Sequence, residues 1–212
     1  MSKKPTFPRI VLASTSPRRI ELLQGLGLKP VVRAPDADET PRKGESPRAL
    51  VSRLARAKAA SVADGLGDSE ASLVIAADTI VVAPGGKKIL GKPRDVAEAR
   101  SMLRSLAGHT HTVLTGYCIH PVGIRGTAGA RPLVRVITSK VTMRKLSAAD
   151  IAAYVATGEP MDKAGSYAAQ GIGMALIESI RGSYANVVGL PVAQLLSDLE
   201  DRFRLELLSW KR

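Results

Sequence analysis

An apolar run followed by hydroxyl residues, a proline and two arginines most constrains what this chain can fold into. Residues 10–13 are apolar and predict a short buried strand, and a leucine-rich stretch with helical periodicity begins at Pro17. Ser16 is suited to cap that helix, and Pro17 to its first position, where the N–H has no helical partner. Free N–H groups beside the guanidinium groups of Arg18 and Arg19 predict either a polyphosphate site or an ordinary strand–helix junction with exposed arginines.

Helices and strands alternate along the rest of the chain, which predicts an α/β fold. Helices are expected at 17–26, 47–62, 96–106, 148–156 and from 191 onward, and strands at 31–34, 73–77, 80–82, 113–119, 134–143 and 174–177. Because no helix separates 113–119 from 134–143, these two strands are expected to pair antiparallel, which makes the sheet mixed.

The domain organisation follows from length and from one unusual segment. A chain of 212 residues is most simply one domain, 1–212, or two lobes that share a core. The Gly-, Pro- and Arg-rich stretch 121–131 is longer than a usual hairpin loop and is expected to be a flexible inserted loop, away from any cleft.

Composition excludes several classes of protein. The net charge of +12 invites a nucleic-acid interpretation, but four Tyr, two Phe and one Trp are too few for a base-stacking surface, and the basic residues are dispersed. The apolar stretch 73–83 is too short to span a membrane, and residues 1–8 lack the apolar region of a signal peptide. A lone cysteine, Cys118, rules out an internal disulfide, as expected in the cytoplasm.

Charged residues in unusual places are the candidates for chemistry. Asp78 interrupts an apolar strand, where a carboxylate is costly unless it is paired, binds a metal or lies at a cleft edge. A structural turn cap and a metal ligand or general base are equally compatible with it. Lys92 is fixed between Gly91 and Pro93, whereas a helical lysine such as Lys58 normally faces solvent. His109 and His111 have no evident third metal ligand, so structural placement is the safer interpretation.

Six blocks of sequence together resemble the Maf family of nucleoside triphosphate pyrophosphatases. They begin with LASTSPRRIELL at 12–23 and continue, in family order, at 45–59, 76–95, 106–116, 162–171 and 182–191. The resemblance covers roughly residues 10 to 200. It implies a Maf/ITPase-like α/β fold: a mixed central sheet flanked by helices, with two lobes and a cleft.

The resemblance also implies roles for individual residues. Asp78 would be the catalytic carboxylate, and Glu39 with Asp78 would hold a divalent cation, Mg²⁺ or Mn²⁺. The triphosphate would be gripped by Ser14, Arg18, Arg19, Lys58 and Lys92. Thr79 and Gln170, with Arg18, resemble the specificity set of the subgroup that acts on dTTP and UTP rather than that of the 7-methyl-GTP subgroup.

The activity implied is hydrolysis of dTTP, UTP and modified pyrimidine nucleotides to the monophosphate and pyrophosphate. A link to cell-division arrest and a homodimer are further expectations, with no nucleic-acid or membrane partner. The alternative is a non-enzymatic regulator of septum formation that binds nucleotide as a signal.

Overall fold

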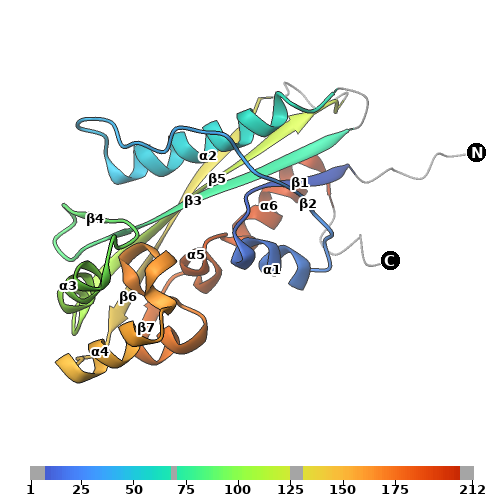
Figure 1. The fold of residues 1–212 in the computed structure, drawn as a ribbon. Coiled ribbons are helices and arrows are strands. Elements are labelled where there is room, and N and C mark those ends of the chain that lie inside the picture. The colour runs from blue at the N-terminus through green and yellow to red at the C-terminus, as the bar shows by residue number, and fades with distance from the viewer. Residues whose placement is uncertain (1–7, 68–70, 125–130, 206–212) are drawn as a thin grey trace, which may run out of the picture.

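The core of the protein is a seven-stranded mixed sheet (Figure 1), seen in a computed structural model that describes residues 8–67, 71–124 and 131–205. The strand order is β2-β1-β3-β5-β6-β7, and β4 pairs with β3. The strands are β1 Arg9–Ala13, β2 Val31–Arg33, β3 Ser72–Val82, β4 Ile89–Leu90, β5 Thr110–Val122, β6 Leu133–Met143 and β7 Ile177–Arg181. β1 runs parallel to β2 and β3, whereas β5 pairs antiparallel with both β3 and β6. The predicted antiparallel pair and the mixed α/β sheet are therefore confirmed.

The helices begin where the sequence supplies caps. They are α1 Pro17–Gly25, α2 Pro47–Ala63, α3 Val96–Leu106, α4 Ala148–Ala156, α5 Tyr184–Val188 and α6 Val192–Phe203, with 3₁₀ turns η1 Glu159–Asp162, η2 Ala164–Ser166 and η3 Gly171–Leu176. Ser46, Asp95 and Ser147 cap α2, α3 and α4 through their side chains. Ser16 takes the cap position of α1, but its hydroxyl makes no cap bond; its own N–H donates to Ser14 Oγ instead. The predicted Ser16 side-chain cap is therefore wrong.

Helices cover both faces of the long strands (Figure 1). A second group of helices, α3 and α4 with the 3₁₀ turns, lies at the end of the sheet away from α1 and α6. Alternate side chains of β3, such as Val74 and Ala76, pack against α2 on one face. The intervening ones, such as Leu73 and Ile75, pack against α1 and α6 on the other. A separate core cluster joins α3, α4 and the 3₁₀ segment. The sheet thus connects two lobes.

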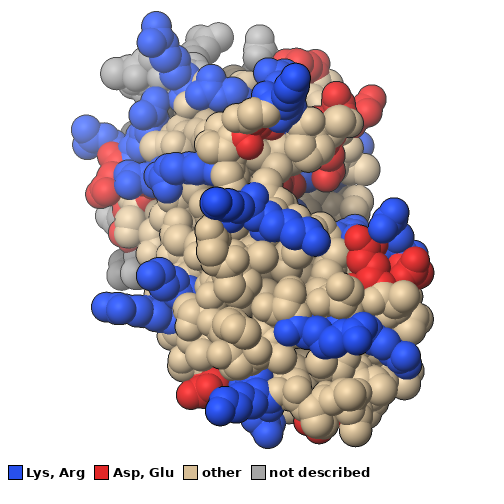
Figure 2. Space-filling view, turned by 90° about the vertical axis from the view of Figure 1, so that its left-hand side faces the viewer, with Lys and Arg blue, Asp and Glu red and all other residues tan. Residues whose placement is uncertain are grey.

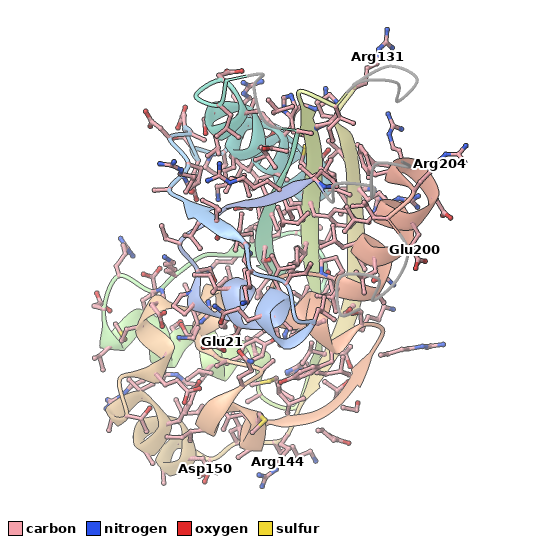
Figure 3. All side chains as sticks on the ribbon, turned by 90° about the vertical axis from the view of Figure 1, so that its right-hand side faces the viewer. Glu21, Arg131, Arg144, Asp150, Glu200 and Arg204 are labelled. Atoms are coloured by element: carbon pink, nitrogen blue, oxygen red, sulfur yellow. The ribbon has the colours of Figure 1, made fainter. Side chains whose placement is uncertain are left out.

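The two lobes place different charged side chains at the two ends of the molecule. In Figure 3, Arg144 and Asp150 lie at the end next to α4, Arg131 lies at the opposite end with Arg204 below it, and Glu200 lies near the middle of the height, on α6. In residues 8–67, 71–124 and 131–205, no helix combines the length and the hydropathy that crossing a membrane requires.

β3 is continuous where the sequence predicted two strands separated at Asp78. It pairs with β5 without interruption from Ser72 to Val82, and Asp78 lies opposite Gly116. On its other side β3 is only partly covered: β1 pairs with it as far as Ile75, and β4 pairs with Val81 and Val82. The described strands therefore leave a gap beside the middle of β3, and Asp78 lies at that gap.

Two further expectations need correction. The strand expected at 174–177 is mostly the 3₁₀ turn η3, and β7 begins only at Ile177, because hydrophobicity alone does not separate an extended segment from a tight turn. The inserted loop expected at 121–131 begins later, since Pro121 and Val122 belong to β5 and are buried. Residues 125–130 of that loop lie outside the described residues.

Candidate active site

A cavity of about 670 Å³ lies at the gap beside β3, and both lobes line it. One wall is the segment from β1 into α1, with the start of the loop after β2, and the opposite wall comes from the 3₁₀ region after α4. Eight of the residues predicted to form the site line the cavity: Ser14, Arg18, Arg19, Glu39, Lys58, Asp78, Thr79 and Lys92. The fold therefore brings together residues that lie far apart in sequence.

A lysine on α2 joins two carboxylates at the centre of the site. Lys58 Nζ lies 2.7 Å from Asp78 Oδ1 and 2.9 Å from Glu39 Oε1. Lys58 and Asp78 are almost fully buried, whereas the Glu39 side chain is 62% exposed. The pair between Lys58 and Asp78 is thus a built-in, desolvated interaction, and Glu39 is the partner that can reorient toward solvent.

The second cation of the site, Arg19, is held by three elements. Its guanidinium donates to Ser14 Oγ (3.2 Å), to Thr79 Oγ1 (3.2 Å) and to the carbonyl of Gly189 (2.9 Å). Burial lowers the pKa of Arg19 from its ordinary value, and the charge of Asp78 opposes that shift. Arg19 is therefore oriented before any ligand arrives.

Two charged residues of the opposite wall were given no role by the sequence argument. Asp162 and Lys163 line the cavity, and Arg18 Nη1 lies 3.9 Å from Asp162 Oδ2 across it. Lys163 Nζ pairs with Asp162. Both residues lie in block 162–171, one of the six blocks that resemble the Maf family, and this placement was the sequence feature that could have indicated a role for them. Lys92 completes the cationic lining from the turn after β4.

The loop that carries Glu39 is fastened to α2 by an arginine that sequence reasoning missed. Arg53 makes a bidentate ion pair with Glu45 (Nε–Oε1 2.7 Å, Nη2–Oε2 2.8 Å). It also donates to the carbonyls of Asp38 (3.5 Å) and Thr40 (3.0 Å), the two neighbours of Glu39. The hydrogen bonds from Arg53 lower the pKa of Glu45 to about 2. The position of Glu39 therefore depends on Arg53.

Gln170 lies beside the cavity rather than in its lining. Its neighbours Tyr167, Ala168 and Ala169 line the wall, and Gln170 itself is half-buried at the start of η3. Its part in recognising a base stays a prediction.

The two histidines do not form a metal site. The His111 ring bonds the hydroxyl of Tyr167 in the core, whereas the His109 ring bonds the carbonyl of Ala107 at the surface. Within the described part of the chain, no three His, Cys, Asp or Glu side chains gather as metal ligands. The structural interpretation of these histidines agrees with this placement.

The arrangement suits a small, strongly anionic ligand that must be attacked by water. Cationic side chains and a helix end surround a carboxylate that can accept a proton, in a cavity lined by both lobes. Positive charge offsets the charge of phosphate groups, and a carboxylate placed among cations can act as a base.

Comparisons with known proteins agree with this chemistry. The dTTP/UTP pyrophosphatase of Anaeromyxobacter dehalogenans is 50% identical over 187 residues, covering 88% of this chain and 90% of its own length. The dTTP/UTP pyrophosphatase of Geobacter sulfurreducens is 47% identical, covering 90% and 95%. That of Shewanella oneidensis is 48% identical, covering 89% and 97%.

A solved nucleoside-triphosphatase / dITP/XTP pyrophosphatase from Mycobacterium abscessus aligns over 92% of this chain and 96% of its own, with a TM-score of 0.38 and 16% identity. That likeness is too weak to carry an argument. The family model described as Maf-like protein matches residues 9–202, nearly the whole chain. This chain therefore belongs to the Maf family.

Proposed function

We propose that this chain is a nucleoside triphosphate pyrophosphatase that hydrolyses dTTP and UTP to the monophosphate and pyrophosphate. Relatives that are 47–50% identical over about nine-tenths of the chain bear the name dTTP/UTP pyrophosphatase. The observation that carries the proposal is the buried Asp78 carboxylate, paired with Lys58 in a cavity that Arg18, Arg19, Lys92 and Lys163 also line.

The cationic side chains would hold the triphosphate. Arg19, already oriented by Ser14 and Thr79, faces the cavity from α1, and Lys58 and Lys92 face it from other elements. Arg18 would exchange its contact with Asp162 for a contact with a phosphate group. A guanidinium can bind two oxygens of a phosphate just as it can bind the two oxygens of a carboxylate. These residues orient the α-phosphorus and neutralise the charge that builds up on the leaving pyrophosphate.

Asp78 would act on the attacking water. Its carboxylate accepts hydrogen bonds only, so it orients the water and takes its proton as the oxygen bonds to the α-phosphorus. The bond between the α-phosphorus and the bridging oxygen then breaks, and pyrophosphate leaves. The Lys58 contact fixes the carboxylate oxygen Oδ1 and leaves Oδ2 for the water.

The carboxylates of Glu39 and Asp78 together suit a divalent cation. Glu39 and Asp78 both lie within 3 Å of one cationic atom, so their oxygens already converge on a position that accepts positive charge. Two carboxylates, completed by phosphate oxygens and waters, are the ligand set that Mg²⁺ typically takes, and Mn²⁺ suits the same oxygens. When bound, the cation would polarise the phosphate oxygens.

The test is product analysis. The purified protein with Mg²⁺ and a panel of nucleotides should release UMP and pyrophosphate from UTP, and hydrolysis in ¹⁸O-labelled water should label UMP. Release of UDP and orthophosphate would overturn the assigned reaction. Binding of UTP without products would instead favour the non-enzymatic regulator of septum formation.

A homodimer and a cytoplasmic location also belong to the proposal. Light scattering of the purified protein tests the first, and fractionation of the source cells tests the second.

A further inference from the structure

The wall of the cavity next to Gln170 is held by side chains that do not themselves line the cavity. Tyr167, Ala168 and Ala169 form that wall, in the segment that Figure 1 draws in orange between α4 and β7. Residues 167–170 lie between the 3₁₀ turns η2 and η3 and belong to no helix or strand, so a regular hydrogen-bond ladder does not fix their backbone.

The Glu159 carboxylate accepts hydrogen bonds from the backbone N–H groups that follow Gln170 in the chain. Its Oε2 accepts the N–H of Ile172 (2.9 Å), and its Oε1 accepts the N–H of Gly173 (3.1 Å). Ile172 and Gly173 are the second and third residues of η3, which begins directly after Gln170. A carboxylate that accepts two backbone N–H groups is a strong, charge-assisted cap.

A tyrosine extends this contact to the near side of Gln170. The hydroxyl of Tyr154 donates to Glu159 Oε1 (3.3 Å) and accepts the N–H of Ala168 (3.1 Å). Independently, the Tyr184 hydroxyl donates to the carbonyl of Ala169 (2.9 Å). The backbone on both sides of Gln170 is therefore bonded to side chains from η1, α4 and α5.

Gly171 shows that the fit is close. Its φ of +68° lies in the left-handed region, and a Cβ there would lie 3.1 Å from Glu159 Oε2. The carboxylate thus packs directly against the backbone of the residue that follows Gln170.

We propose that Glu159 is a positioning residue that sets the choice of base, by fixing the backbone on both sides of Gln170. The inference rests on the proposed function, because it assigns Gln170 and the 167–169 wall to the base end of a nucleoside triphosphate. Glu159 does not line the cavity, so it acts through the loop and not on the phosphates. Loss of Glu159 should therefore weaken discrimination between bases more than it weakens hydrolysis.

The experiment compares Glu159→Ala, Glu159→Gln and Tyr154→Phe with Glu178→Ala, which removes an exposed carboxylate of β7. For each, kcat and KM are measured with UTP, dTTP, ATP and GTP, together with hydrogen exchange of peptides spanning 167–174. In Glu159→Ala the preference for UTP over ATP should fall on the order of tenfold, chiefly through the KM for UTP, because discrimination by hydrogen bonding requires a fixed partner. Exchange should rise in 167–174 alone. Glu159→Gln keeps one acceptor oxygen and should lie between Glu159→Ala and the wild type.

Several results would overturn the proposal. One is an equal loss of kcat/KM for all four nucleotides with the preference intact, which is the signature of a merely structural residue. Another is unchanged exchange in 167–174. If Glu159→Ala does not fold, Tyr154→Phe must show the same narrowing of preference, to a smaller extent. If the wild type does not prefer pyrimidines, the proposed function fails, and the exchange data still decide whether Glu159 fixes this loop.

Discussion

Asp78 and Thr79 are consecutive residues of β3 and point to opposite faces of the sheet, as alternation in a strand requires. Asp78 meets Lys58 of α2, and Thr79 meets Arg19 of α1. Both nevertheless line the cavity, because the gap beside the middle of β3 opens onto both faces. Strand β3 thus places the candidate base, Asp78, next to Thr79, which orients the candidate phosphate-binding residue Arg19.

Asp78→Asn tests the candidate base. The substitution keeps the side-chain volume but removes the negative charge and the proton acceptor, so kcat for UTP should fall at least about 10²-fold, within the usual range of general-base contributions. Steady-state kinetics measures this, with Asp201→Asn on α6 as the control and circular dichroism to verify folding. Near-normal turnover by a folded Asp78→Asn protein would exclude Asp78 as the base.

Gln170→Glu tests the base end of the site. A carboxylate cannot donate to a pyrimidine carbonyl as an amide does, and a lost or repulsive contact of this kind costs about 1–3 kcal/mol. The kcat/KM for UTP should drop accordingly, while competitive inhibition by pyrophosphate is retained because the phosphate grip is intact. Unchanged UTP kinetics would place Gln170 outside the substrate contacts.

The pairing within the site could be predicted only in part from the sequence. Motif resemblance indicated Asp78, Lys58 and Glu39, but their mutual contacts depend on α2 lying across β3, which no local pattern specifies. Arg53 was missed because its partners, Glu45 and two carbonyls, lie in an irregular loop. Glu159 was missed because its contacts are with the N–H groups of Ile172 and Gly173 and with the Tyr154 hydroxyl, none of which a sequence motif marks.

At the scale of elements, α2 is the helix on which the site depends. It supplies Lys58 to the cavity and Arg53 to the Glu39 loop. Its approach to the sheet is close: a Cβ at Gly116 of β5 would lie 2.3 Å from the carbonyl oxygen of Val51. Gly116 lies opposite Asp78 in the strand pair, so the same contact sets how far Lys58 stands from Asp78.

Gly116→Ala should therefore destabilise the protein and displace Lys58. Overpacking typically costs 1–3 kcal/mol, and here the neighbour is backbone that cannot rotate away, so a loss of about 3 kcal/mol in the free energy of unfolding is expected. Gly25→Ala, in α1 with open space around a new Cβ, is the matched control and should be neutral or slightly stabilising. Urea denaturation measures both. Equal stability of the two variants would contradict this packing.

The pattern of elements was largely predictable, and the failures have a physical cause. Capped helices with an apolar stripe, such as α3 and α4, were recognised because their signals are local. The continuity of β3 through Asp78 was not recognised, because it depends on pairing with β5, where the residue opposite Asp78 is Gly116, far along the chain. The turn η3 was predicted to be a strand because it contains a short apolar run. A short apolar run does not distinguish a strand from a turn that packs its side chains into the core.

At the scale of the whole molecule, basic side chains are spread over the surface, whereas the candidate site residues are gathered in one cavity. Lys and Arg side chains are distributed over the face shown in Figure 2, among uncharged surface and smaller groups of Asp and Glu, in a chain of net charge +12. Such a field draws anions of any kind toward the protein and raises their rate of encounter. Selection among anions must therefore come from the cavity between the lobes.

The stability of the whole fold should depend on pH through His111. Its ring is buried in the core and bonds the hydroxyl of Tyr167, and burial lowers its pKa from 6.5 to about 4. Between these two values the unfolded chain binds a proton that the folded protein excludes, so the free energy of unfolding falls as the pH falls from 6.5 toward 4. Burial lowers the pKa of His120 as well, which acts in the same direction.

The magnitude follows from the shift, since each pKa unit corresponds to about 1.4 kcal/mol, so His111 should remove on the order of 3 kcal/mol by pH 4. Urea denaturation from pH 7.5 to 4.5 measures the slope in the wild type and in His111→Gln, which has no titrating ring. The variant should be less stable at pH 7.5, because the Tyr167 contact is altered, and should lose stability less steeply below pH 6.5. His109→Gln, at the surface, controls for removal of a histidine as such. Parallel curves for His111→Gln and the wild type would show that proton exclusion at His111 does not govern the acid limb.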